Sequence, residues 1–136
     1  MMTPTTVSES FIKWMEDNGF GTFGTDIFLN QIPDDAIDNA FWVVTAGGEV
    51  ASKNVSAESI QQFSTQVYYR NVSGKEVEHH LFALNQKVNT RGAFAIDGFD
   101  LYAIEATMPE DNDKDAENRP QASLVVAIEI YVSYVS

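Results

Sequence analysis

Alternating carboxylates in one polar segment are the residues best spaced to bind a metal ion. Asp111, Asp113 and Asp115 match the opening of a calcium-binding loop, in which alternate carboxylates direct oxygens at one hard cation. The rest of that motif is absent, because Ala116 stands where the loop requires Gly and Ala122 where it requires Glu. We therefore interpret the segment as a solvated acidic loop and keep weak divalent-cation binding at the three aspartates as an alternative. The acidic residues of this loop are Glu110, Asp111, Asp113, Asp115 and Glu117.

Both histidines of the chain lie beside carboxylates in one predicted helix. Glu76 and His79 have the Glu-x-x-His spacing of carboxylate-bridged di-iron helices, but such a site needs two helices of this kind and the chain supplies one. Glu76 and His80 are equally well explained as an exposed pair one helical turn apart. No motif places one of the many Ser or Thr residues beside a base. We therefore expect no metal cofactor and no enzymatic activity.

Three glycines near the N-terminus match the letters of a dinucleotide-binding fingerprint. Gly19, Gly21 and Gly24 give the pattern G-x-G-x-x-G, which binds a pyrophosphate only where a strand ends and a helix begins. Here the glycines follow a predicted helix and precede a predicted strand, so the order of elements is reversed. We interpret them as a helix end and a flexible turn, and we expect no cofactor there.

The composition predicts one folded, acidic domain spanning residues 1–136. Hydrophobic residues make up 44% of the 136 residues, which is enough for a single core. The formal net charge is −12 and the 8 Lys and Arg residues are scattered, so the chain is poorly suited to bind nucleic acid. The absence of Cys excludes disulfides and thiolate-bound metals. No stretch is apolar over a membrane's thickness, so we expect no membrane partner.

Two segments have the residue spacing of amphipathic helices, and five have the composition of strands. The segment after Ala40 lacks polar alternation, which predicts a central strand that ends at Gly47-Gly48. The predicted helices are residues 7–18, capped by Thr6 with Glu9, and residues 73–87, capped by Ser73 with Glu76. The predicted strands are residues 25–32, 40–45, 61–71, 99–108 and 122–135, with a short partner strand at 94–96 before an Asp97-Gly98 turn and a loop at 109–120.

The order of these elements predicts an α+β fold. The order is helix, strand, strand, strand, helix, strand, strand (α-β-β-β-α-β-β). We expect it to give a mostly antiparallel sheet of four to six strands with two main helices packed on one face. We expect residues 1–6 to be flexible. An open sheet of this kind has two edges with unpaired backbone groups, which we expect another chain to cover.

One segment of the chain resembles part of a known family. It runs from Asn18 to Asn39 and reads NGFGTFGTDIFLNQIPDDAIDN. Together with the apolar strand and the Gly47-Gly48 pair that follow, it resembles small minor capsid or tail terminator proteins of long-tailed bacteriophages. In that family a helix leads through a glycine-bearing turn to a short apolar strand, a Pro-Asp turn, a hydrophobic strand and a paired glycine. This chain has all five in order. A strand ending in Arg70, a helix and two long strands follow the family layout more loosely.

The resemblance implies a non-enzymatic assembly protein of the virion tail or neck, made in the host bacterial cytoplasm. Copies of such a protein form a ring, expected to be a hexamer, that caps the tail tube and offers a docking face to the head connector. DNA would pass through the bore of the ring without specific binding. No cofactor and no catalytic residue is carried over. Two alternatives remain: a head-completion protein that binds the portal and, from another class, a small-ligand or divalent-cation binding module.

We expect subunit or partner contacts at two polar connections, residues 33–39 and 47–56. Polar and glycine-rich connections beside a central strand commonly become ordered only on contact. The negative charge is expected to suit the bore, because carboxylates form no salt bridges with phosphates. The residues that we assign to the contacts are Pro33, Asp34, Asp35, Asp38, Gly47, Gly48, Glu49 and Lys53.

Overall fold

The computed structural model describes residues 6–32, 38–53, 58–90, 100–112, 114–115 and 118–133, and within them it confirms the α+β fold. Residues 1–6 were predicted to be flexible: residues 1–5 lie outside the described residues, whereas Thr6 is described and caps the first helix. The 94–98 hairpin and most of the 33–39 connection also lie outside the described residues. Elements follow the predicted order with one further strand near the end. They are α1 (Val7–Asp17), β1 (Ile27–Leu29), β2 (Ala40–Lys53), β3 (Glu58–Arg70), α2 (Gly74–Asn89), β4 (Asp100–Ala106), β5 (Glu110–Asn112) and β6 (Gln121–Ser133).

One six-stranded sheet organises the chain. Its strand order is β1-β2-β3-β6-β4, with β5 pairing β6 beyond the end of β4. Only β1 and β2 are parallel, so the sheet is mostly antiparallel as predicted. Residues 40–45 lie in an interior strand as predicted, between β1 and β3, and β3 occupies the middle of this order.

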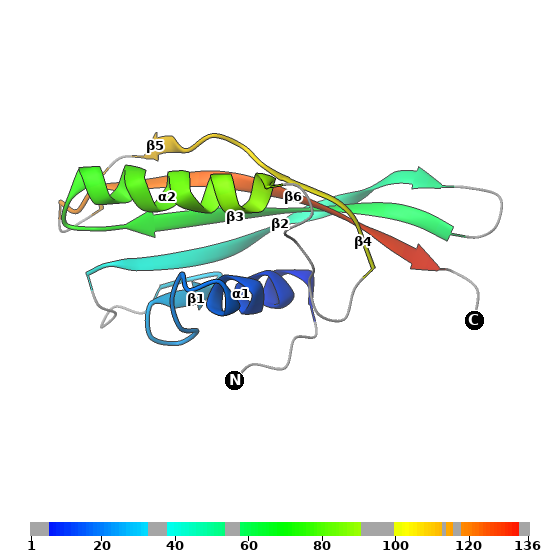
Figure 1. Cartoon of the computed structure of the whole chain (residues 1–136), viewed down its shortest axis with the longest axis horizontal. Helices are drawn as coiled ribbons and strands as arrows, with labels where there is room; N and C mark the ends of the chain where they lie inside the picture. The colour runs from blue at the N-terminus through cyan, green and yellow to red at the C-terminus, as the bar shows by residue number, and fades with distance from the viewer. Residues whose placement is uncertain are drawn as a thin grey trace.

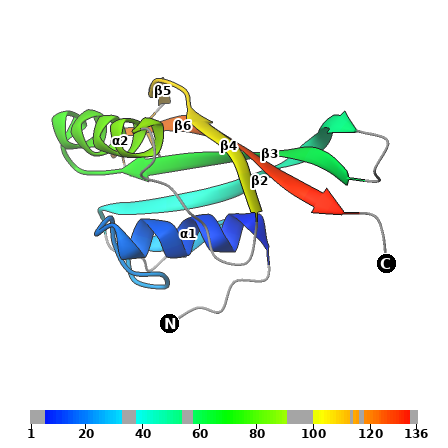
Figure 2. The same ribbon diagram turned by 45° about the vertical axis from the view of Figure 1, so that its right-hand side comes forward.

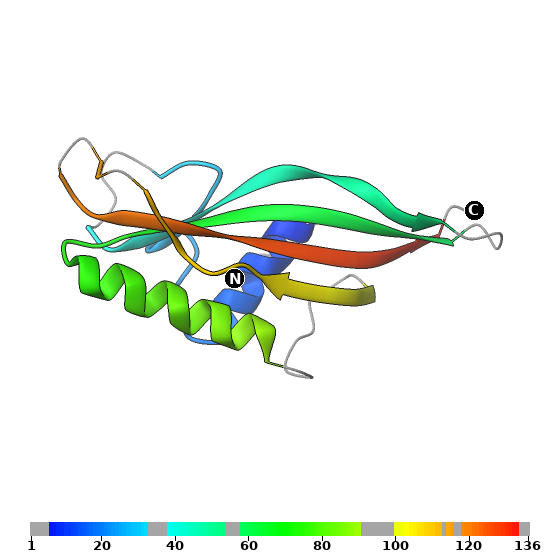
Figure 3. The same ribbon diagram turned by 90° about the horizontal axis from the view of Figure 1, so that it is seen from above.

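Both helices cover the same face of the sheet (Figures 1 and 3). Helix α1 packs against β1 and β2, and α2 packs against β3, β6 and β4. The predicted period-two face of β6 is confirmed for Leu124, Val126, Ile128 and Ile130, all of which are buried in the one shared core. The opposite face has no helix among the described residues, and the neighbouring rings of Trp42 and Tyr68 stack on it.

The strands β2, β3 and β6 continue well past the helices and form an extended arm (Figures 1 and 2). The prediction that Gly47-Gly48 ends a strand is therefore wrong: β2 continues to Lys53 and pairs with β3 along its length. Register shifts between Thr45 and Gly48 and between Val50 and Ser52 explain the error, because the extra residues are absorbed as bulges within the ladder. Residues 47–53 are consequently strand and not the polar connection that was expected.

The predicted ends of α1 are confirmed, whereas the cap predicted for α2 is not. Thr6 and Glu9 form both hydrogen bonds of a capping box, and Gly19 follows the helix with a positive φ of 82°. Ser73 has the backbone conformation of a cap but makes no side-chain hydrogen bond with the helix. The carboxylate of Glu76 lies instead 3.5 Å from His80, which confirms their pairing along the helix.

Strand boundaries differ from the predicted ones by a few residues, and the 109–120 connection is more structured than expected. The 25–32 segment contributes only the three residues of β1. Asn30, with a φ of 67°, ends the strand because extended backbone cannot continue through that conformation. Within the predicted loop, residues 110–112 form β5 against the start of β6.

A relay of aromatic rings joins the two helices across the sheet. The ring of Phe41 in β2 lies 6.2 Å from Phe20, which follows α1, and 4.3 Å from Tyr69 in β3. Tyr69 in turn stacks on His80 of α2 at 4.9 Å. Contacts of this kind add to the free energy gained by burying the rings, so the relay fixes how each helix sits on the sheet.

Burial raises the pKa of the Tyr69 hydroxyl above its usual value of about 10. The unfolded chain then releases this proton at a lower pH than the folded protein does, so the free energy of unfolding should fall as pH rises above about 10. We expect Tyr69→Phe to flatten this part of the pH profile. The check is urea unfolding between neutral and strongly alkaline pH, with Tyr102→Phe at an exposed ring as the matched control. Equal slopes in the two variants would contradict the prediction.

Candidate functional site

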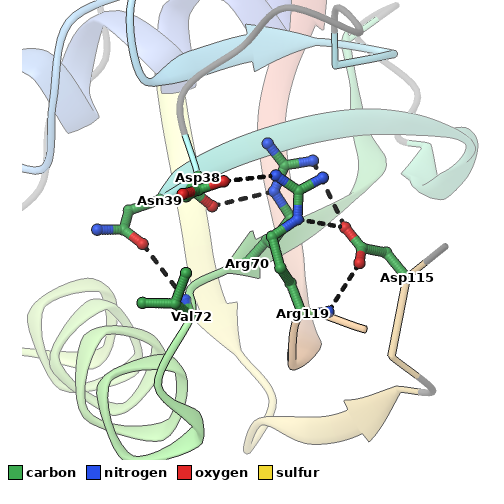
Figure 4. Close-up of polar contacts among 6 residues, drawn as sticks. All are labelled: Asp38, Asn39, Arg70, Val72, Asp115 and Arg119. Carbon is green, nitrogen blue, oxygen red and sulfur yellow. Dashed lines mark hydrogen bonds and ion pairs between the residues drawn. The ribbon is translucent and has the colours of Figure 1, made fainter. Parts of the chain in front are cut away.

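Two arginines that are far apart in the sequence meet at the end of β3 (Figure 4). Arg70 is 6% exposed, and its Nε donates a hydrogen bond to the carbonyl oxygen of Asp38 at 3.0 Å. Arg119, in the segment before β6, donates from Nη1 to the Asp38 carboxylate at 2.9 Å. Both guanidinium groups approach the same carboxylate of Asp115, Arg119 at 2.8 Å and Arg70 at 3.8 Å. We call these four residues the arginine cluster.

The arginine cluster fixes the position of the acidic segment. One oxygen of Asp115 accepts from the Arg119 side chain, and the other accepts from the Arg119 backbone N–H at 2.8 Å. The cluster therefore holds the segment between β5 and β6 against the residues that precede β2. Hydrogen bonds between charged groups are among the stronger ones, so this link is a structural clamp.

The clamp changes the interpretation of the alternating aspartates. The Asp115 carboxylate is engaged by two guanidinium groups, whereas Asp111 lies exposed in β5 and Asp113 falls outside the described residues. Glu110 is also exposed in β5, and Glu117 is not described. Within the described part of the chain no three His, Asp or Glu side chains are grouped as metal ligands. Calorimetry with millimolar calcium is the direct test of the cation alternative.

The structure places only part of the predicted contact residues. Asp38 is exposed, with a side chain 63% accessible, and belongs to the arginine cluster. Pro33, Asp34 and Asp35 lie outside the described residues. Gly47, Gly48, Glu49 and Lys53 lie in the arm, in β2, rather than in a loop. Whether any of them touches another chain stays a prediction.

Sequence reasoning missed the arginine cluster because it treated the basic residues as scattered. Arg119 and Asp38 are 81 residues apart, and local spacing carries no information about such a pair. The one available signal was the position of Arg70 at the end of a predicted strand with one buried face. The order of elements predicted around the glycines is confirmed, since α1 precedes Gly19 and β1 follows Gly24.

A groove lies between α2 and the β4–β5 connection. Its volume is ≈ 560 Å³, within the range of pockets that enclose ligands. Apolar groups from Phe82, Met108, Pro109 and Ala122 line it. Phe82 is 47% exposed and Met108 63% exposed, which is unusual for large hydrophobic side chains grouped at one place.

Comparison with known proteins shows which family the chain matches. A family model described as bacteriophage tail terminator protein matches residues 14–132, from within α1 to near the end of β6. No curated protein matches the chain significantly. Neither described helix is long and apolar enough to cross a membrane.

Proposed function

Because the chain belongs to the bacteriophage tail terminator family, we propose that its copies form a ring, a hexamer, that caps the tail tube. The family makes the chain a structural protein of phage tail assembly. Ring size and partners are the proposed part: the ring stops growth of the tube on one side and docks with the head connector on the other. The protein performs no chemistry in this role.

The observation that supports a ring is the difference between the two borders of the sheet. One border is the three-residue parallel strand β1, and the other carries β4 and β5 beside α2. Neighbouring copies that pair one border with the other would therefore join unlike surfaces. Such heterologous contacts close into a ring when the rotation between copies suits it. The arm adds backbone groups along β2, beyond the reach of β1, to which a neighbour can pair.

The open face of the sheet is the surface we assign to the bore. Glu105 of β4 and Glu129 of β6 lie on this face, with Gln62 near them. Carboxylates do not pair with DNA phosphates, and screening over about 8 Å limits their repulsion to close approach, so the wall lets DNA slide. A ring structure with Glu105 and Glu129 on its outer rim would contradict this assignment.

The test of the proposed function is assembly with tube protein. Native mass spectrometry and negative-stain images are recorded for the protein alone, for polymerised tube alone and for the mixture. We expect rings, and tubes capped at one end, in the mixture. Protein that stays monomeric and leaves both tube ends bare would contradict the proposal, and binding to portal protein instead would assign it to head completion.

A further inference from the structure

We propose that neighbouring copies in the ring join edge to edge: residues 101–104 of β4 in one copy pair as an antiparallel ladder with residues 46–53 of β2 in the next. The partner is thus a second copy of this chain, and backbone groups make the contact. This inference depends on the ring proposed above, and it adds the segments that join the copies.

An asparagine side chain closes one end of the outer edge of β4 and leaves the other end open. The backbone N–H of Ala106 donates to the side-chain oxygen of Asn89 at 2.8 Å, and the Asn89 nitrogen donates to the Ala106 carbonyl oxygen at 3.0 Å. The next N–H, that of Thr107, donates to β6 instead. Because backbone groups alternate in direction along a strand, those of Ile104 point outward like those of Ala106. Among the described strands only β6 pairs with residues 101–104, so their outer side has no strand beside it.

The border at β2 has the same arrangement. Strand β1 pairs with β2 only from Phe41 to Val43. Asn30 then extends this contact, because its backbone N–H donates to the Val43 carbonyl oxygen at 2.7 Å and its side-chain oxygen accepts from the Thr45 N–H at 3.3 Å. Beyond Thr45, β2 continues to Lys53 with only β3 beside it among the described strands. Both borders of the sheet are therefore closed near the helices and open along the arm.

The two open stretches lie at the same level of the sheet and run in opposite directions. Gly48 pairs with Phe63, Phe63 pairs with Ile128, and Ile128 pairs with Ile104 of β4. One row of residues thus crosses the sheet from one open edge to the other, and Figure 3 shows β2 and β4 as its two borders there. Each strand is antiparallel to the next in the order β2-β3-β6-β4, so β2 and β4 point in opposite directions.

This geometry suits a closed ring. A neighbour's β4 placed beside β2 continues the antiparallel alternation of the sheet without a break. Repeating the same contact from copy to copy closes the sheets into one barrel-like ring, in which no edge of this kind stays unpaired.

The composition of the open stretches favours pairing. Residues 101–104 read LYAI and carry no charge, and residues 46–53 read AGGEVASK, with charges only at Glu49 and Lys53. Neither stretch contains proline. Soluble proteins commonly protect exposed edge strands with charged residues or proline, so edges of this composition are suited to an interface. The bonds join backbone groups, so the contact needs no opposite charges on its two sides.

Disulfide cross-linking tests the pairing, because the chain has no cysteine of its own. Ala103→Cys, at an exposed position of β4, is combined in turn with a cysteine at each residue from 46 to 53, and each double variant is oxidised with polymerised tube protein present. These substitutions leave the backbone hydrogen bonds of the contact in place. We expect a ladder of covalent multimers up to the full ring at one best position. The yield should fall at the residues on either side of it, because successive residues of a strand face opposite sides.

The matched control combines Ala103→Cys with Ala83→Cys, an exposed position on α2, and should give no ladder. Hydrogen exchange, measured with and without polymerised tube protein, supplies an internal control. On ring formation the amide of Ile104 should exchange at least tenfold more slowly. The amides of Ala106 and Thr45 already donate to asparagine side chains and should change less than twofold.

The outcomes separate the edge contact from the ring itself. Rings without a ladder and without slower exchange at Ile104 would overturn the edge pairing and leave the ring intact. Equal cross-linking at every position from 46 to 53 would indicate random collision and would also overturn the pairing. A ladder from open chains without rings would support the pairing and overturn the ring, whereas the absence of both ladder and rings would overturn both.

Discussion

Replacing Asp115 by Ala is expected to lower the free energy of unfolding by about 3 kcal/mol, because it removes a carboxylate that lies against two guanidinium groups, Arg119 at 2.8 Å and Arg70 at 3.8 Å. Arg119 loses two hydrogen bonds to the same carboxylate, at 2.8 Å each. The positively charged guanidinium groups of Arg70 and Arg119 then have less negative charge beside them. The measurement is urea unfolding followed by tryptophan fluorescence, and Asp115→Asn, which keeps the size of the side chain, should show a smaller loss.

The matched control for this change is Asp17→Ala. Asp17 pairs with Lys13 at 3.3 Å on the surface of α1, with its own side chain 54% exposed. Exposed ion pairs contribute little, so this variant should change the free energy of unfolding by less than about 0.5 kcal/mol. A loss below about 1 kcal/mol for Asp115→Ala would show that the arginine cluster is a surface feature and not a clamp.

Short-range patterns predicted the parts of the fold that depend on short-range physics. The capping box at Thr6 and the buried face of β6 both follow from residues a few positions apart, and both are confirmed. The prediction that a strand ends at Gly47-Gly48 is wrong because the pairing of β2 with β3 over the whole arm outweighs the local preference of glycine for turns. The sequence therefore predicts element types better than element ends.

The arginine cluster shows where sequence reasoning reaches its limit. Arg119 and Asp38 meet only after β2, β3 and β6 have paired, so the contact is a product of the completed fold. The same holds for the groove beside α2, whose walls come from the helix and from the connection between β4 and β5. The types of single residues could predict neither the arginine cluster nor the groove, because both features depend on which segments become neighbours in the fold.

Replacing Phe41 by Ala is expected to cost about 3 to 5 kcal/mol of unfolding free energy. Phe41 is 2% exposed, and its ring contacts Phe20 after α1 and Tyr69 of β3. The change removes a buried ring and leaves a cavity at the point where the helices are joined across the sheet. A domain of this size has a free energy of unfolding of about 5 to 15 kcal/mol, so the variant loses a large part of it.

The measurement for Phe41→Ala is thermal and urea unfolding beside the ring assay with tube protein. Phe41→Leu is the matched control, since it fills part of the cavity and should lose less than half as much stability. We expect ring yield to follow the folded fraction in both variants, because Phe41 lies in the core and is 2% exposed. A stability loss below about 1 kcal/mol, or loss of rings from a fully folded variant, would contradict the role of the relay as the joint between the helices.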